Sequence, residues 1–202
     1  MKKLLVMILL FFSIMTANAQ LVKVSFGIKG QGIASLMNTE IKPSTYVQLG
    51  GGGGAFLGMK VGRVIGLQVE GLYSYQNASF AISDKLGNNI WNSTQQYLYV
   101  PAVLQLWCGR SFAFEFGYQQ AIALSGTLSS SGNVKDDTGI LDYGSLVAGM
   151  NINMGKVAFL SFRYTHAMQY SYVMFKDPSK CMSLQVGLGF RFFTSRKSVF
   201  VK

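Results

Sequence analysis

Apolar and polar residues alternate along most of this chain with a period of two. Such alternation is typical of β-strands with one buried face, because successive side chains point to opposite sides of a strand. The clearest example begins at Met182 and ends at Phe192, with large apolar side chains on one face and Ser, Gln, Gly and Arg on the other. Turn-forming residues separate such segments. The eight predicted strands cover residues 22–36, 46–62, 64–82, 95–108, 110–125, 143–154, 156–171 and 181–193.

The composition of the two strand faces indicates a membrane protein. Hydrophobic residues make up 50% of the 202-residue chain and charged residues only 13%, about half the usual charged share. The charge-bearing face also carries most of the small residues, which suits the inside of a narrow barrel, whereas the apolar and aromatic face suits lipid. Strands in lipid have to close on themselves, because no water pairs a free edge there. The predicted fold class is all-β: an eight-stranded antiparallel up-and-down transmembrane β-barrel.

The connections between the predicted strands alternate between short and long. Three are minimal, at Gly62-Arg63, at Cys108-Gly109-Arg110 and at Gly155-Lys156, and the longest runs from Gly126 to Asp142. Short periplasmic turns and longer outer loops are typical of barrels in bacterial outer membranes. We therefore expect localisation in the cell outer membrane. An even number of strands then places both termini on the periplasmic side.

The N-terminal segment has the features of a cleaved secretory signal peptide. Lys2 and Lys3 precede an apolar run over residues 4–15, and Ala17 and Ala19 form a small-residue cleavage site before Gln20. The apolar run is too short for a membrane-spanning helix, which needs about 20 residues. Loss of the two lysines lowers the net charge from +10 to +8. The predicted organisation is a signal peptide over 1–19, a barrel over 20–193 and a basic periplasmic tail over 194–202.

Several strand motifs resemble those of a known family. FGIKGQGIASL, EGLYSYQNASF, YLYVPAVLQ, FRYTHAM and LQVGLGFRF occur in this order along the chain. Together they resemble the PorT-like, "porin family" outer-membrane β-barrel proteins of Bacteroidota. The resemblance covers the whole mature chain and implies architecture more than activity, because the family is functionally mixed. One of its branches is tied to the type IX secretion pathway.

The last predicted strand also resembles the signal that the barrel-assembly machinery reads. A polar residue, a glycine and two aromatic residues carry this resemblance, at Gln185, Gly187, Phe190 and Phe192. It implies a transient contact with that machinery during biogenesis. The chain departs from the family beyond this strand. Family members commonly end near the final aromatic residue, whereas this chain continues to Lys202.

The predicted topology divides the positive charge between two places. Arg63, Arg110, Lys156 and the tail fall on the periplasmic side, where phospholipid headgroups or an acidic partner would receive them. This placement argues against nucleic-acid binding. Other charges fall inside the barrel, where a carboxylate is costly unless it is paired. We expect an interior charge network in which Glu70 and Glu115 pair with some of Lys29, Lys60, Arg163 and Arg191.

Few residues suggest a catalytic or ligand-binding site. His166 is the only histidine, on the lipid-facing parity, and Met168 stands where an outer-surface His–Ser lipid hydrolase would need its serine. Cys108 and Cys181 are expected at opposite ends of the barrel, too far apart for a disulfide. The glycine run at 50–54 lacks the lysine of a phosphate-binding loop. Trp107 is predicted in an aromatic girdle at the membrane interface. We expect no catalytic, cofactor or metal site.

The sequence therefore predicts a non-enzymatic integral outer-membrane barrel with a structural or interaction role, accessory to secretion or envelope assembly. Contacts would run through the outer loops or through the basic periplasmic rim. The expected partners are outer-membrane lipid and an envelope protein. Two alternatives stay open. One is a lipid-modifying enzyme centred on His166, with Ser161 or Ser171 within reach of its ring. The other is a narrow channel, although eight strands leave an interior only wide enough for side chains.

Overall fold

The computed structural model describes residues 22–39, 45–84, 87–130, 133–136, 140–169, 171–174 and 177–197. These residues form eight long strands and two short ones, β6 (Asn133–Asp136) and β9 (Tyr172–Met174). The predicted signal peptide, with Ala17, Ala19 and Gln20, lies outside the described residues. The long strands are β1 (Val22–Thr39), β2 (Thr45–Val61), β3 (Ile65–Asp84), β4 (Gly87–Cys108), β5 (Phe112–Ser130), β7 (Tyr143–Met154), β8 (Ala158–Ala167) and β10 (Asp177–Lys197).

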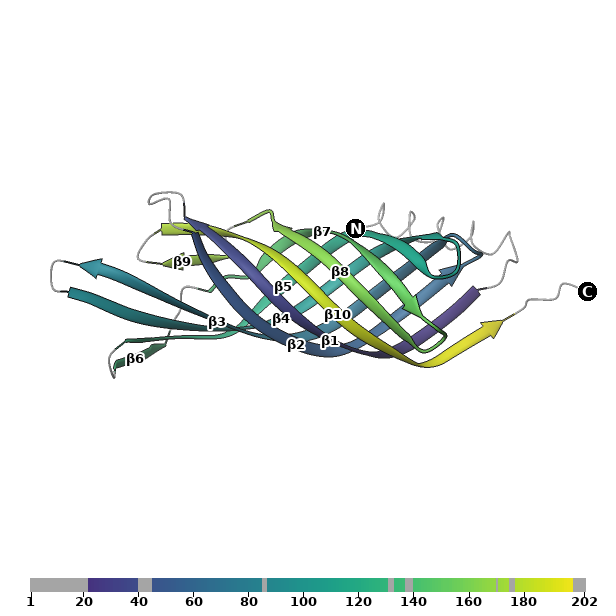
Figure 1. Ribbon diagram of the computed structural model, residues 1–202, viewed down its shortest axis with the longest axis horizontal. Coiled ribbons are helices and arrows are strands. Elements are labelled where there is room, and N and C mark those ends of the chain that lie inside the picture. The colour runs from purple at the N-terminus through teal and green to yellow at the C-terminus, as the bar shows by residue number, and fades with distance from the viewer. Residues whose placement is uncertain are drawn as a thin grey trace, which may run out of the picture.

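The eight long strands close into one antiparallel barrel (Figure 1). Each pairs with the next long strand, and β1 pairs with β10 from Val22 opposite Lys197 to Thr39 opposite Ser179. The two short strands add to the rim, where β6 pairs with β5 and β9 with β10. Closure leaves the wall of the barrel without a free strand edge, which confirms the predicted fold class. Among the described residues, no helix is long and apolar enough to cross a membrane.

The strands differ from the predicted segments mainly at their ends. β4 begins at Gly87, well before the predicted start at residue 95, whereas β3 ends at Asp84, close to the predicted end at residue 82. The β3–β4 hairpin projects beyond the barrel (Figure 1). Backbone pairing needs no apolar face, so a hairpin can continue where the alternation of side chains stops. β8 is shorter than predicted, and β10 continues into the predicted tail as far as Lys197.

Three tight turns lie at one end of the barrel, over residues 62–64, 109–111 and 155–157. Each begins with a glycine at positive φ: 64° at Gly62, 80° at Gly109 and 77° at Gly155. Glycine adopts this conformation without the steric cost that a side chain would add. The start of β1 and the end of β10 lie at the same end. We call it the short-turn end and the opposite end the loop end.

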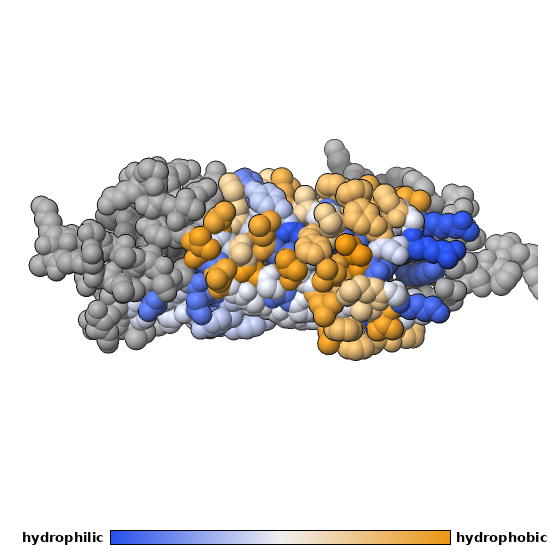
Figure 2. All heavy atoms as spheres, in the orientation of Figure 1, coloured by the Kyte–Doolittle hydropathy of each residue, from blue (hydrophilic) through white to orange (hydrophobic). Residues whose placement is uncertain are grey.

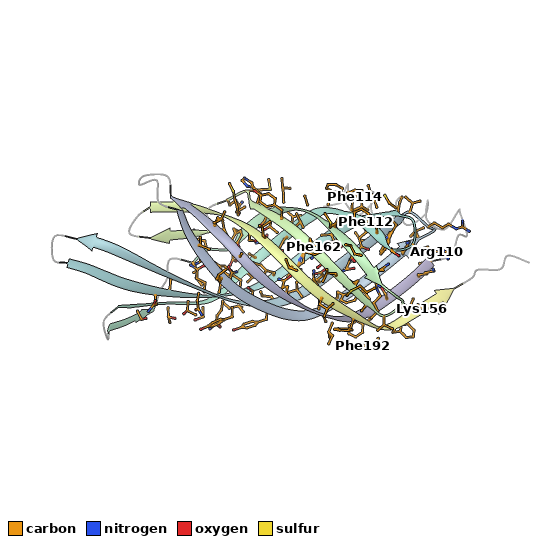
Figure 3. All side chains as sticks on the ribbon, in the orientation of Figure 1. Arg110, Phe112, Phe114, Lys156, Phe162 and Phe192 are labelled. Carbon is orange, nitrogen blue, oxygen red and sulfur yellow. The ribbon has the colours of Figure 1, made fainter. Side chains whose placement is uncertain are left out.

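Side chains alternate between the lumen and the outer surface along the barrel strands. On β4, Val103 is fully buried whereas its neighbour Leu104 is 43% exposed. Exposed apolar side chains cover the middle of the visible face in Figure 2. Phe114 and Phe162 are among them and point away from the barrel in Figure 3. The predicted orientation, with the apolar face outward, is confirmed.

The lumen also holds large aromatic side chains, which the expectation of a small and polar interior missed. Phe56 stands opposite Gly27 in the β1–β2 pair, and Phe159 stands opposite Gly189 in the β8–β10 pair. A Cβ atom added at Gly27 would lie 2.7 Å from the Phe56 ring. Each glycine thus leaves the space that an aromatic ring fills, and the two rings pack edge to face with centroids 5.2 Å apart. Because a narrow lumen has to be filled, a small residue on one strand leaves space for a large side chain on the neighbouring strand.

A β-bulge near the end of β10 changes the alternation there. The register between β1 and β10 shifts between Phe26, which pairs with Phe193, and Gly27, which pairs with Arg191. Phe192 is the extra residue. As a result, both Phe192 and Phe193 are exposed on the outer surface, and the side chain of Thr194 again lines the lumen. Bulges of this kind re-aim side chains at the rims of barrels.

The lipid-facing surface predicts a depth-dependent cost for a new charge. Val186 lies midway along β10 and is 48% exposed, whereas Val157 lies in a short turn and is 55% exposed. We expect Val186→Arg to lower the free energy of unfolding in phospholipid vesicles by about 2–4 kcal/mol, and Val157→Arg by about 0–1 kcal/mol. Urea titration of both refolded variants measures the difference. Equal losses would contradict the placement of β10 across the hydrocarbon layer.

Candidate functional site

The middle of the lumen contains a buried network of ion pairs centred on Arg163. Its guanidinium binds Glu70 through two hydrogen bonds, Nη1 to Oε2 at 2.9 Å and Nη2 to Oε1 at 2.6 Å. Its Nε donates to Glu115 Oε2 at 2.6 Å. Lys29 Nζ lies 3.2 Å from Glu70 Oε2. All four side chains are buried, and they come from β8, β3, β5 and β1.

Neutral amides complete the hydrogen bonding of the two carboxylates. Gln68 Nε2 donates to Glu70 Oε1 at 2.6 Å. Gln105 Nε2 donates to Glu115 Oε1 at 2.8 Å, and Asn151 Nδ2 donates to the same oxygen at 3.2 Å. Buried charges are tolerated when paired and fully hydrogen-bonded, and the formal charges of this network cancel. The network therefore fixes the positions of strands on opposite sides of the lumen.

Two glycines provide the room for the long cationic side chains. A Cβ atom at Gly187 would lie 2.6 Å from Lys29 Cε, and one at Gly149 would lie 3.0 Å from Arg163 Cγ. Gly149 is directly opposite Arg163 in the β7–β8 pair. The glycines on the inward-facing parity thus accompany the charged residues for a steric reason.

A layer of hydroxyl and aromatic groups lies between this network and the loop end. Ser35 Oγ donates to Gln76 Oε1 at 2.9 Å, and Gln76 Nε2 donates to the Tyr99 hydroxyl at 2.6 Å. That hydroxyl lies 3.3 Å from the hydroxyl of Tyr143. Cys181 packs in the same cluster as a buried free thiol, while Cys108 is an exposed free thiol at the other end of the barrel.

Of the four cations expected as possible partners, Lys29 and Arg163 pair with the two carboxylates. Lys60 and Arg191 lie apart from the central network. Arg191 Nη2 donates to Asn153 Oδ1 at 2.7 Å, and its guanidinium packs 4.6 Å from the Phe159 ring centroid. Lys60 Nζ lies 3.9 Å from the centroid of the Trp107 ring. Both residues belong to the short-turn end, so they are too far along their strands to reach the mid-barrel carboxylates. Strand parity predicts the direction of a side chain but not its height in the lumen.

Trp107 is inside the barrel and not in an interfacial girdle. Its side chain is only 7% exposed, and its Nε1 atom is buried without a hydrogen-bond partner among the described residues. The space beside Nε1 exists because Gly66 has no side chain; a Cβ atom there would lie 3.0 Å away. Trp107 shares its strand parity with Val103 and Gln105, which also face the lumen. This parity is the sequence feature that could have predicted its location.

The short-turn end contains a cavity of about 500 Å³ that is lined by cations. Its wall includes Trp107 and several neutral residues but no carboxylate from the described part of the chain. Hydrophilic residues gather at this end in Figure 2, and Figure 3 places Arg110 and Lys156 there. We call it the cationic cavity. The five cations that line it are Lys23, Lys60, Arg110, Lys156 and Arg191.

The remaining candidate residues lie where strand parity places them. His166 is half-buried beside Tyr164, whose hydroxyl lies 3.5 Å from His166 Nδ1. Ser161 faces the lumen instead and donates to Gly187 O at 3.5 Å. Ser171, in the segment between β8 and β9, is buried. The described residues contain no group of His, Cys, Asp and Glu side chains that would hold a metal ion.

The four residues of the expected assembly signal lie on β10, next to β1. Gln185 is buried and its Nε2 atom donates to Gln119 Oε1 at 3.4 Å. Gly187 faces the lumen beside Lys29. Phe190 and Phe192 are exposed on the outer surface. Recognition of this strand by the assembly machinery stays a prediction.

A family model described as the outer membrane protein beta-barrel domain matches residues 4–192. The chain belongs to this family. The match extends over the described barrel strands except the end of β10, and it supports localisation in the outer membrane. No curated protein sequence matches the chain.

Solved structures that resemble this family member share little sequence with it. Neisserial surface protein A is 9% identical, with a TM-score of 0.55 over 84% of this chain and 99% of that one. Ail, the attachment invasion locus protein of Yersinia pestis, is 10% identical, with a TM-score of 0.49 over 84% and 99%. The outer membrane protease OmpT of Escherichia coli is 8% identical, with a TM-score of 0.37 over 85% and 96%. At 9% identity, the likeness to Neisserial surface protein A shows the fold alone.

The central network predicts that Arg163 is important for stability. Arg163→Met leaves Glu115 without a cation and Glu70 with Lys29 alone, so we expect a loss of about 3–5 kcal/mol in the free energy of unfolding. Arg191→Met is the matched control, because Arg191 binds the neutral Asn153, and its loss should be about 1 kcal/mol. Urea unfolding of the refolded proteins in vesicles gives both values. Similar losses in the two variants would show that Arg163 contributes no more to stability than Arg191.

Proposed function

We propose that this protein is a non-enzymatic outer-membrane barrel with an interaction role, and that it contacts an anionic envelope partner through its basic short-turn end. The proposal places this end, and both termini, on the periplasmic side. Its support is that each connection at this end is a three-residue turn, whereas at the other end five residues separate β1 from β2 and the β3–β4 hairpin projects beyond the barrel. In bacterial outer-membrane barrels, the short turns face the periplasm and the longer loops face outward.

The separation of charge along the barrel carries this proposal. The central network is neutral, with Lys29 and Arg163 against Glu70 and Glu115. The cations at the short-turn end include the five of the cationic cavity and Arg63. The remaining carboxylates of the described residues lie at strand ends or connections at the loop end: Asp84, Asp136, Asp142 and Asp177. One end of the barrel therefore has an uncompensated positive field, which attracts anionic partners.

The resemblance to PorT-like proteins of Bacteroidota belongs to the same proposal. Its motifs lie on β1, β3, β4, β8 and β10, so they follow the strands that build the lumen. An accessory part in secretion or envelope assembly suits a barrel whose charged surface faces the periplasm. Partners in those processes would reach the protein from that side.

The arrangement of side chains favours neither alternative activity. For a lipid-modifying enzyme, His166 would need a nucleophile on the outer surface, but Ser161 points into the lumen and Met168 occupies the outward position two residues on. For a channel, the lumen would need a continuous water path. Arg163 instead joins carboxylates from β3 and β5 at the middle of the barrel, with all three side chains buried.

Charge reversal at the short-turn end tests the proposed interaction. A tagged protein carrying Arg63→Glu and Lys156→Glu, both exposed in short turns, should recover its envelope partner from native membranes about tenfold less well than the unchanged protein. The matched control carries Lys135→Glu and Lys180→Glu, on β6 and β10 at the loop end, and should recover it fully. Quantitative mass spectrometry of the co-purified proteins gives the ratio. A loss confined to the control would move the contact surface to the outer loops.

A further inference from the structure

We infer that the cationic cavity binds a small anion with two or more phosphate-type charges. This inference rests on the proposed function, because it identifies the chemistry that the periplasmic end recognises. The cavity holds about 500 Å³ and five cationic side chains line it. That size lies in the range of small-molecule sites. No described carboxylate lines the wall, in contrast to the balanced network above it.

The strand register forces like charges together at this place. Lys23 is directly opposite Lys60 in the β1–β2 pair and directly opposite Arg196 in the β1–β10 pair. Like charges at directly opposed positions destabilise a sheet. Three adjacent strand ends thus carry a row of cations that costs stability in the empty protein. A bound polyanion would remove that repulsion, so the row is explained by a ligand and not by the fold.

Other contacts hold Lys60, Arg191 and the backbone of Arg110 in position before any ligand binds. Asn153 Nδ2 donates to the backbone oxygen of Arg110 at 3.1 Å, while Asn153 Oδ1 accepts from Arg191 Nη2. One asparagine therefore ties the turn that carries Arg110 to the guanidinium of Arg191. Lys60 is held over the Trp107 ring. Prepositioned donors reduce the entropy that binding would otherwise cost.

The chemistry of the wall favours a phosphate-type ligand. Lysine ammonium groups and arginine guanidinium groups both donate charge-assisted hydrogen bonds to phosphate oxygens, and they converge here from several strands. The lumen of an eight-stranded barrel has room only for side chains or one small ligand, which excludes a nucleic-acid duplex or a folded domain. Two sources share this chemistry: a soluble phosphorylated compound and the headgroup of a phospholipid in the periplasmic leaflet.

Calorimetric titration with sodium pyrophosphate tests the inference. The full mature chain is refolded in a neutral maltoside detergent, which carries no competing anion. We expect saturable binding at one site per chain, weakened by added salt. In a Trp91→Phe background, Trp107 is the only tryptophan left, and its fluorescence should change over the same pyrophosphate range. Absence of saturable binding in the unchanged protein, together with an unchanged Trp107 fluorescence in the Trp91→Phe background, would overturn the inference.

Matched variants locate the site. Lys60→Gln and Arg191→Gln each remove a charge from the cavity wall and should weaken binding about tenfold or more. Arg63→Gln removes a charge three residues from Lys60, in a turn outside the cavity, and should leave binding unchanged. Heat-modifiable gel migration checks that each barrel is folded. An equal effect of Arg63→Gln would reduce the result to general charge attraction and contradict a defined site.

Nanodiscs distinguish the two sources of the ligand. If the ligand is a headgroup, discs with anionic phospholipid should weaken pyrophosphate binding relative to discs of neutral lipid, whereas a soluble ligand predicts equal binding in both. Either result supports the cavity as the site. Failure of this inference can be told apart from failure of the proposed function. If the protein recovers its envelope partner but does not bind pyrophosphate, only the inference about the cavity is wrong. Pyrophosphate binding without a recovered partner would remove the interaction role alone.

Discussion

The ion pairs between Arg163 and the carboxylates of Glu70 and Glu115 are the interaction on which the rest of this structure depends. A barrel in a membrane has its apolar side chains outside, so its interior cannot be held together by a hydrophobic core of the usual size. Polar groups enclosed in the lumen have to satisfy one another. A guanidinium that reaches two strands at once meets that requirement across the lumen.

The neutrality of this network determines where the remaining charge goes. The charges of two cations and two carboxylates cancel at mid-height in the lumen. The other described cations inside the barrel therefore lie away from this network. The aromatic pair Phe56 and Phe159 lies next to Arg191, and the cationic cavity follows toward the short turns. The lumen is thus arranged in layers, with hydroxyl groups near the loop end, balanced charges in the middle and excess positive charge at the other end.

Much of this could be predicted from alternation alone. Period two correctly assigned the outward face of β10 and the inward direction of Lys29, Glu70, Glu115 and Arg163, because the side-chain direction of a strand residue follows from its parity. The height of each residue in the lumen depends on strand register and stagger, which alternation does not contain. For that reason alternation could not tell which of Lys29, Lys60, Arg163 and Arg191 would pair with the two carboxylates. Trp107 was misplaced because aromatic residues near strand ends are common in girdles as well as in lumens.

The most direct test of this inside-out arrangement compares neighbouring methyl groups on one strand. Val103 and Leu104 are adjacent on β4, with 0% and 43% of their surfaces exposed. Nuclear Overhauser effects between lipid acyl protons and methyl groups, measured on the unmodified protein in nanodiscs, report which side chain contacts hydrocarbon. The account predicts strong effects at Leu104 and none at Val103. Strong effects at Val103, with none at Leu104, would contradict it.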